Sequence, residues 1–240
     1  YTRLLQRGHD ERALYELATD ALSELRRRVP AEAVAGLPGF DIARNLREVS
    51  LLLDWYWPAV KGSAAPDAVR AEFEAAWRAA LPNMWQAGTT LTLYDFHVDN
   101  LLLLPGRAAF KACGLLDFQD AIAGPVPFDL ASLLEDVRRN VSKPLAAAMI
   151  DRYLAGNPDL SRDAFLTAYA ASAAQRNCRI VGTFARLLRR DSKPWYQRFM
   201  PRVWELLEHD IAHPAMAPVA AWFARHLPAA ERRPLIDISQ

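Results

Sequence analysis

The chain has 240 residues, of which 52% are hydrophobic and 24% charged, a composition typical of a folded protein rather than a disordered one. Its 29 basic and 28 acidic residues leave a formal net charge of +1, which argues against a nucleic-acid or membrane-surface partner. No apolar run approaches the roughly 20 residues that a membrane helix needs, and the opening YTRLLQRGHDER is too polar for a signal peptide. Because Cys113 and Cys178 lack a CxxC spacing, we expect them to be reduced core residues of a cytoplasmic protein.

In chain order, apolar residues first recur at helical spacing, which predicts helices over 11–28, 43–60 and 66–81. Runs rich in β-branched and apolar residues then predict short strands over 89–96, 101–104 and 110–118, with a turn at Pro105-Gly106. After Gly124-Pro125 the helical pattern returns over 127–139, 143–155, 161–189, 194–212 and 216–226. We therefore expect a mostly α protein with a small β-hairpin element, in the α+β class.

The predicted β-element carries polar side chains where its strands end. Asp95 and Asn100 have the D-x-x-x-x-N spacing of a kinase catalytic loop, in which the Asp deprotonates the attacking hydroxyl and the Asn holds Mg²⁺. Asp117 follows the next apolar run, where a second metal-binding Asp is expected. Oxygen-bearing side chains suit a hard ion such as Mg²⁺, and carboxylates buried together need a cation. Taken singly, either aspartate could instead cap a turn.

Three longer runs extend this pattern: YDFHVDNLLLLPG, ACGLLDFQDAIAGPVPFDLASLLEDVRR and AAQRNCRIVGTFARLLRRDSKPWY. Over nearly its whole length the chain resembles the aminoglycoside phosphotransferase/choline kinase-like superfamily. Within that group it most resembles the bacterial N-acetylmuramate/N-acetylglucosamine anomeric kinases of cell-wall recycling. The two central motifs are specific for the superfamily but not for the substrate.

By this resemblance, Asp95 would be the catalytic base, and Asn100 and Asp117 would bind Mg²⁺ and ATP. His97 lies where protein kinases usually carry a lysine, so it would contact the γ-phosphate or brace the loop. Asp129 would brace the catalytic loop, although its position at the start of a predicted helix fits an N-cap equally well.

Arg176 and Asn177 lie in a stretch that resembles the substrate-side helix of the family, and they are candidate substrate-binding residues. The chain also departs from the family pattern. Leu93 and Tyr94 stand where the loop normally carries Arg, often His-Arg, before the aspartate. The loss of that cation favours, as one alternative, a catalytically inactive pseudokinase module.

The resemblance also implies the organisation of the chain. No Gly-rich phosphate loop and no lysine in a V-A-I-K-like strand precedes the motifs. We therefore expect residues 1–240 to form a single kinase-like C-terminal lobe, with a helical part (1–88), the β-element with its motifs (89–120) and a second helical part (121–240). The missing N-terminal lobe would be its partner, and the lobe alone would be poorly active.

The function implied is Mg-ATP-dependent transfer of a γ-phosphoryl group to a small-molecule hydroxyl, the anomeric hydroxyl of an amino sugar. Alternative acceptors are an aminoglycoside, a choline-like compound or homoserine. A zinc hydrolase is a third class, because His209 and His213 imitate an H-E-x-x-H helix. However, Asp210 is a short substitute for Glu, and no third ligand is evident.

Overall fold

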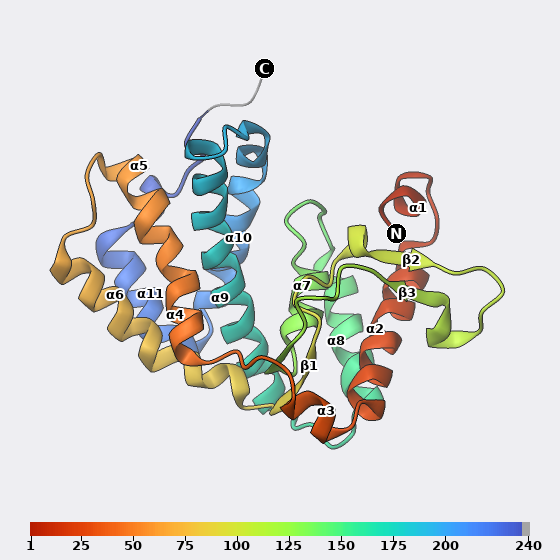
Figure 1. Ribbon diagram of the computed structural model, residues 1–240. Helices are drawn as coiled ribbons and strands as arrows, with labels where there is room; N and C mark the ends of the chain where they lie inside the picture. The colour runs from red at the N-terminus through yellow and green to blue at the C-terminus, as the bar shows by residue number, and fades with distance from the viewer. Residues whose placement is uncertain (237–240) are drawn as a thin grey trace. The chain divides into compact units, whose positions relative to one another are not determined.

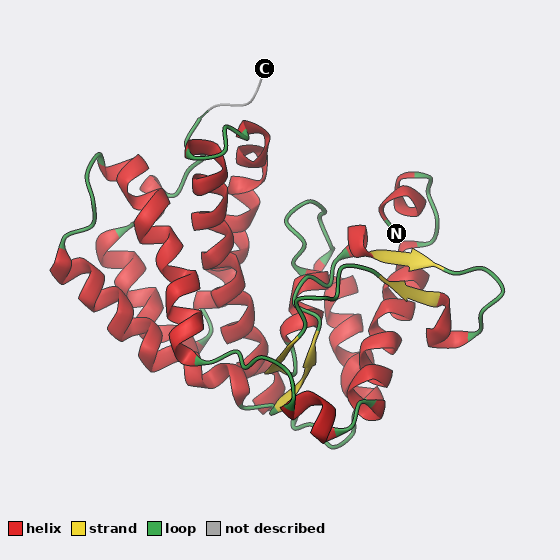
Figure 2. Cartoon of the chain, viewed as in Figure 1, coloured by secondary structure: helices red, strands yellow, loops and turns green. Residues whose placement is uncertain are grey.

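The computed structural model describes residues 1–236. Helices dominate it, and the strands are short (Figure 2). The chain divides into two compact units, each built from two separate segments. The first consists of Tyr1–Phe40 and Trp85–Tyr169, and the second of Asp41–Met84 and the chain from Ala170 onward. The expected organisation as one C-terminal lobe stays a prediction.

The first unit combines the strands with a set of helices (Figure 1). Its helices are α1 (Thr2–Gln6), α2 (Glu11–Arg28), α3 (Ala31–Ala35), α7 (Phe128–Leu134) and α8 (Lys143–Gly156), followed by the first turns of α9 (Arg162–Arg189). Aspartate and serine side chains begin two of them: Asp10 accepts the backbone N–H of Ala13 at 3.1 Å, and Ser142 accepts that of Leu145 at 3.3 Å. These are N-caps, which satisfy donors that a helix start otherwise leaves unpaired.

Two separate two-stranded antiparallel sheets replace the single β-element that we expected. In one, β2 (Leu101–Leu103) pairs with β3 (Cys113–Leu115), which confirms a hairpin around the Pro105-Gly106 turn. In the other, β1 (Thr89–Thr92) pairs with β4 (Ile122–Pro125), a strand that the sequence did not predict. Gly124 lies opposite Thr90, and a Cβ there would lie 2.6 Å from the Thr92 hydroxyl, so this pairing requires a glycine.

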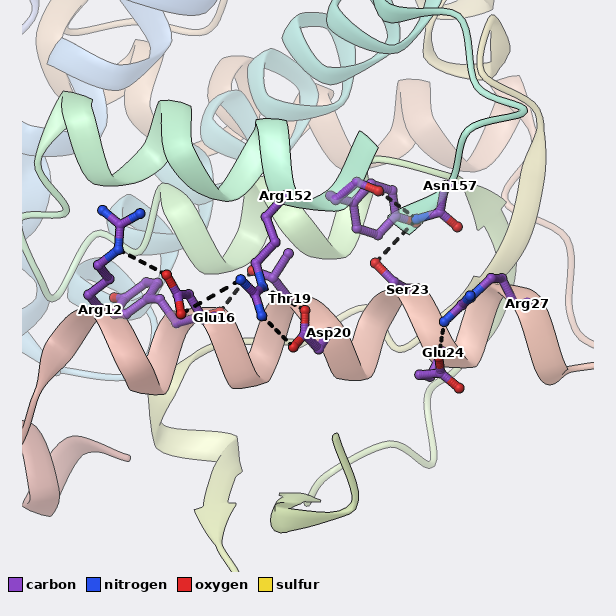
Figure 3. A network of polar contacts seen from close by, with 11 residues as sticks. Arg12, Glu16, Thr19, Asp20, Ser23, Glu24, Arg27, Arg152 and Asn157 are labelled. Carbon is purple, nitrogen blue, oxygen red and sulfur yellow. Dashed lines mark hydrogen bonds and ion pairs between the residues drawn. The ribbon is translucent and has the colours of Figure 1, made fainter. Parts of the chain in front are cut away.

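The core of the first unit lies where α2 packs against α8, side by side in Figure 1. The apolar faces contribute side chains that are almost fully buried, among them Tyr15, Met149 and Tyr153. Figure 3 shows the polar edge of this interface, where Arg152 bonds Asp20 at 2.6 and 2.8 Å. At the other end of this edge, the side chain of Asn157 links the two helices. The amide of the fully buried Asn157 donates to the Ser23 hydroxyl at 3.2 Å and to the Tyr153 carbonyl at 2.7 Å.

The second unit is helical within the part of the chain that the structure describes. It contains α4 (Ile42–Leu51), a π-helical turn (Leu52–Tyr56), α5 (Trp57–Lys61), α6 (Asp67–Ala80), the rest of α9, α10 (Met200–Ile211) and α11 (Ala217–His226). Its core is aromatic: the rings of Phe73 and Trp222 lie 4.7 Å apart at 71°, an edge-to-face contact.

At Gly182 the backbone of α9 touches that of α4. A Cβ added there would lie 2.2 Å from the carbonyl carbon of Leu51, just before the π-helical turn. Only glycine allows two helices to approach so closely.

Most of the predicted helices are confirmed, with ends that differ by a few residues. The short helices α1 and α3 were missed because a single turn carries too little apolar periodicity to recognise. Cys113 and Cys178 are free and buried, as expected. None of the helices in residues 1–236 combines the length and apolar character that a membrane crossing needs.

Candidate active site

The loop between β1 and β2 carries Asp95, and the carboxylate of Asp129 holds its backbone. From the first turn of α7, the buried Asp129 accepts the backbone N–H of Leu93 at 2.6 Å and that of Tyr94 at 3.0 Å. No side chain caps the start of α7, so the Asp129 carboxylate tethers the loop and does not act as the N-cap. Hydrogen bonds to a carboxylate are stronger than those to a neutral acceptor, and the burial of Asp129 shields both bonds from water.

Tyr94 occupies the place where the kinase loop carries its arginine. Its φ of 76° puts it in the left-handed region, which costs a non-glycine residue about 1–3 kcal/mol. Its ring stacks on Phe128, with centroids 5.7 Å apart and planes at 8°, and meets Phe40 edge-on at 5.9 Å. Aromatic packing and the Asp129 bonds therefore offset the backbone cost and hold the residue just before Asp95.

His97 and Asn100 lie in the same loop as Asp95, and the amide of Asn100 joins them. Its Nδ2 donates to the backbone carbonyl of Asp95 at 2.9 Å and lies 3.4 Å from Nε2 of His97. The backbone N–H of Asn100 also bonds the His97 carbonyl at 2.9 Å. With its nitrogen engaged by the loop, the amide of Asn100 keeps its oxygen available as a ligand for a cation.

Asp117 follows β3, and the hairpin brings its backbone close to Asn100. The N–H of Leu116 donates to the carbonyl of Asn100 at 2.9 Å, which continues the β2–β3 ladder by one bond. Asp117 has a φ of 57°, its side chain is exposed, and its carboxylate accepts a 2.6 Å bond from Gln119. The hairpin register thus places the two proposed magnesium ligands on neighbouring strand ends.

Asp99, between His97 and Asn100, is tied to two other segments of the first unit. The Thr2 hydroxyl donates to it, and the guanidinium of Arg138 lies 3.7 Å from its carboxylate. Arg138 also reaches the fully buried Asp136, at 3.4 Å through its side chain and at 3.0 Å through its backbone N–H. Sequence pattern alone does not point to Arg138 or Asp136, because the link from Arg138 to the loop is a long-range contact.

Apolar side chains surround the polar ends of the hairpin and remain exposed. Leu102, Leu103, Leu116 and Phe118 have exposed fractions of 43%, 37%, 46% and 56%. A pocket of about 730 Å³ lies between α1 and β2, and its lining includes Leu102, Leu103 and Asp99. An apolar floor next to polar strand ends suits a ligand that has a flat apolar part and a charged part.

The two weaker candidates, Arg176 and Asn177, lie on α9 in the second unit. Asn177 is fully buried, and its amide donates to the Asp210 carboxylate at 2.8 Å. Arg176 is 5% exposed. Burial of this kind favours packing within the second unit, and a substrate role for either residue stays a prediction.

His209 and His213, the pair that the zinc alternative needs, lie in the last turn of α10 and just after that helix. His213 Nδ1 accepts the backbone N–H of Ala215 at 3.2 Å, which is a helix-cap contact after α10 has ended. Within residues 1–236, no three His, Cys, Asp or Glu side chains form a group that could hold a metal ion. The Asn100 and Asp117 pair would need ligand oxygens from a bound nucleotide or water to complete a magnesium shell.

Comparison with known proteins assigns this arrangement to a family. The family model described as Phosphotransferase enzyme family (APH) matches residues 3–166. The N-acetylmuramate/N-acetylglucosamine kinase of Caulobacter vibrioides is 39% identical over 97% of this chain and 66% of its own length. The kinase of the same name from Pseudomonas aeruginosa is 30% identical over 88% of this chain and 62% of its own. The chain thus spans less than two thirds of these relatives.

Solved structures show the fold. The GDP complex of wild-type aminoglycoside 2'-phosphotransferase-IIIa superposes with a TM-score of 0.52 at 21% identity, covering 85% of this chain and 64% of the other. At that identity the likeness establishes the fold alone.

Proposed function

Because this chain belongs to the phosphotransferase enzyme family, we propose that it transfers the γ-phosphoryl group of Mg-ATP to the anomeric hydroxyl of an amino sugar, N-acetylmuramate or N-acetylglucosamine. The relatives named as kinases of these sugars support the acceptor. One structural observation carries the chemistry: the Asn100 amide is bonded to the Asp95 backbone, and the Asn100 carbonyl to the strand that leads to Asp117.

Asp95 is the proposed catalytic base. Its carboxylate would accept the proton of the sugar hydroxyl as that oxygen bonds to the γ-phosphorus, and the bond to the bridging oxygen of the diphosphate would break to release ADP. His97, whose ring reaches Asn100, would hold the loop or donate to the transferred phosphoryl group. Catalysis of this kind depends on positioning, so the tether from Asp129 to the loop has a direct role.

Magnesium is the proposed metal because the available donors are oxygens. The amide oxygen of Asn100 and the carboxylate of Asp117 suit a hard ion that keeps other ligands from water and phosphate. When bound, the ion would neutralise charge on the phosphates. The exposed leucines of the hairpin would lie under the purine of the nucleotide. Since the solved relative is a GDP complex, GTP is the alternative donor.

We also propose that these residues correspond to the C-terminal lobe of a kinase-like fold in a cytoplasmic enzyme, with the ATP clamp supplied by an N-terminal lobe. The share of the relatives that the chain spans supports this organisation. The isolated lobe would bind nucleotide weakly and turn over slowly.

The test is a coupled assay that detects ADP or GDP release with N-acetylmuramate, N-acetylglucosamine, an aminoglycoside, choline and homoserine. The 240-residue chain and the chain joined to an N-terminal lobe are compared. We expect sugar-dependent turnover that EDTA abolishes, and a loss of about 10²–10⁴ in kcat for Asp95→Asn. Asp163→Asn, an exposed carboxylate in the first turn of α9 and in the same unit, is the matched control and should keep most activity. If none of the tested acceptors supports turnover, or if both variants lose activity equally, the assignment is refuted and the pseudokinase alternative is favoured.

A further inference from the structure

The catalytic loop carries no arginine or lysine of its own. Residues 93–100, LYDFHVDN, hold two carboxylates, Asp95 and Asp99, four positions apart. Two negative charges in one short loop repel each other, and this repulsion favours opening of the loop unless a cation from another segment offsets it. Arg138 supplies such a cation, because its Nε lies 3.7 Å from the Asp99 carboxylate. The Thr2 hydroxyl also donates to Asp99, but it brings no charge.

Arg138 is held in place by the turn that connects α7 to α8. The fully buried Asp136 accepts the backbone N–H of Arg138 at 3.0 Å and lies 3.4 Å from its guanidinium. The neighbouring Arg139 anchors the same turn to α2 through bonds of 2.9 and 2.6 Å to Glu11. Because these contacts fix the turn on both sides, the guanidinium of Arg138 meets Asp99 from a preorganised position.

Asp99 in turn influences the position of Asn100. Both belong to the short helical turn Val98–Asn100, and the backbone N–H of Asn100 closes this turn with a 2.9 Å bond. Val98 anchors one side of the turn in the core, where it is 3% exposed, whereas the side chain of Asp99 is 43% exposed. The contact with Arg138 therefore restrains the side of the turn that core packing does not hold.

We propose that Arg138 is a positioning residue that ties down Asp99 and so fixes the Asn100 amide at the magnesium site. Asn100 is the link to the chemistry, because its amide bonds the Asp95 carbonyl at 2.9 Å and its oxygen is a proposed ligand of the ion. The turn after α7 thus provides the positive charge that the loop lacks. The effect of Arg138 on catalysis rests on the proposed function, whereas its effect on the loop does not.

Amide hydrogen exchange of the full chain, followed by NMR without nucleotide or metal, tests the tether directly. Arg138→Gln should speed the exchange of the Asn100 and Leu116 N–H groups about fivefold, because an exposed ion pair is a weak interaction. The Leu93 and Tyr94 N–H groups, which a different carboxylate holds, should stay within about twofold of the wild-type rate.

Two further variants separate a tether from a general effect on stability. Arg138→Lys should restore most of the protection, since it keeps the charge that faces Asp99. In an Asp99→Ala background, Arg138→Gln should have no further effect, because the two residues act as one unit. In the two-lobe enzyme, Arg138→Gln should also lower kcat about fivefold and leave the nucleotide KM within about twofold.

Arg152→Gln is the matched control, because Arg152 is a similarly exposed arginine of the same unit and pairs with Asp20 of α2 (Figure 3). It should change neither the exchange of the loop nor kcat. Arg138→Gln should fold normally, because residue 138 still donates its backbone N–H to Asp136, and circular dichroism checks that its Tm is kept.

The tether is refuted if the Asn100 N–H of Arg138→Gln exchanges at the wild-type rate, if the effect persists in the Asp99→Ala background, or if Arg152→Gln has the same effect. Turnover by the wild type with a kcat that Arg138→Gln leaves unchanged would also overturn the positioning role, while the proposed function stands. Faster exchange of the loop in Arg138→Gln, together with a wild type that turns over no acceptor, would refute the proposed function and leave the tether intact.

Discussion

Replacing Asp129 with asparagine separates the geometry of the catalytic loop from its chemistry. The side chain keeps its shape, but one of its two acceptor oxygens becomes an NH₂ donor. In either orientation that group faces a backbone N–H, of Leu93 at 2.6 Å or of Tyr94 at 3.0 Å, so one buried hydrogen bond is lost. A buried bond to an ionised acceptor contributes about 1.5–3 kcal/mol, so we expect the free energy of unfolding to fall by about 2 kcal/mol.

The same change should affect turnover. Tyr94 is held at a φ of 76°, and without both bonds it would relax toward an ordinary conformation and shift Asp95, the next residue. A displacement near 1 Å can cost about 10²-fold, so we expect kcat to fall by about 10–100-fold while KM for the nucleotide changes less. Urea unfolding gives the first quantity, and steady-state kinetics on the two-lobe enzyme, at a temperature where the variant is folded, gives the second.

Two results would refute this reasoning. If the free energy of unfolding of Asp129→Asn lies within about 0.5 kcal/mol of the wild-type value, the Asp129 bonds do not hold the loop. A clear loss of stability with unchanged kcat would mean that the loop position does not govern the chemistry. Asp163→Asn serves as the control here as well, because it also replaces a carboxylate with an amide in the same unit, but at an exposed position away from the loop.

Two further predictions concern stability. Gly182→Ala should lower the free energy of unfolding by more than about 3 kcal/mol in urea, because its Cβ would lie 2.2 Å from the backbone of Leu51. Gly36→Ala is the control and should be tolerated, because the nearest backbone atom there is 3.6 Å away. Equal effects of the two substitutions would contradict the close helix contact. Arg26 lowers the pKa of Asp159 below its usual 3.8, so this pair stabilises the fold above about pH 4 and loses its contribution as the pH falls through the lowered value. Because the carboxylate of Asp159 is largely exposed and screened by water, the difference in unfolding free energy between wild type and Asp159→Asn should stay below about 1 kcal/mol at pH 6 and shrink toward pH 2. A difference independent of pH would contradict the assignment.

Local pattern in the sequence was enough for the helices and the chemical motifs. Helix α2 was predicted with its observed ends, Glu11 and Arg28, because its apolar face repeats over five turns. The spacing of Asp95, Asn100 and Asp117 likewise indicated a phosphotransferase motif without any knowledge of the fold, and the family match supports that interpretation.

Contacts between residues far apart in the chain were not predictable from local pattern and are seen only in the folded structure. Periodicity says which face of a segment is apolar but not which other segment covers it, so the pairing of β1 with β4 was missed. The tether from Asp129 to Leu93 and Tyr94 spans about 35 residues, and it exists only because α7 packs against that loop. The exposure of Trp195 has the same origin: an aromatic residue after a helix normally packs, and the folded chain alone determines that this ring faces water.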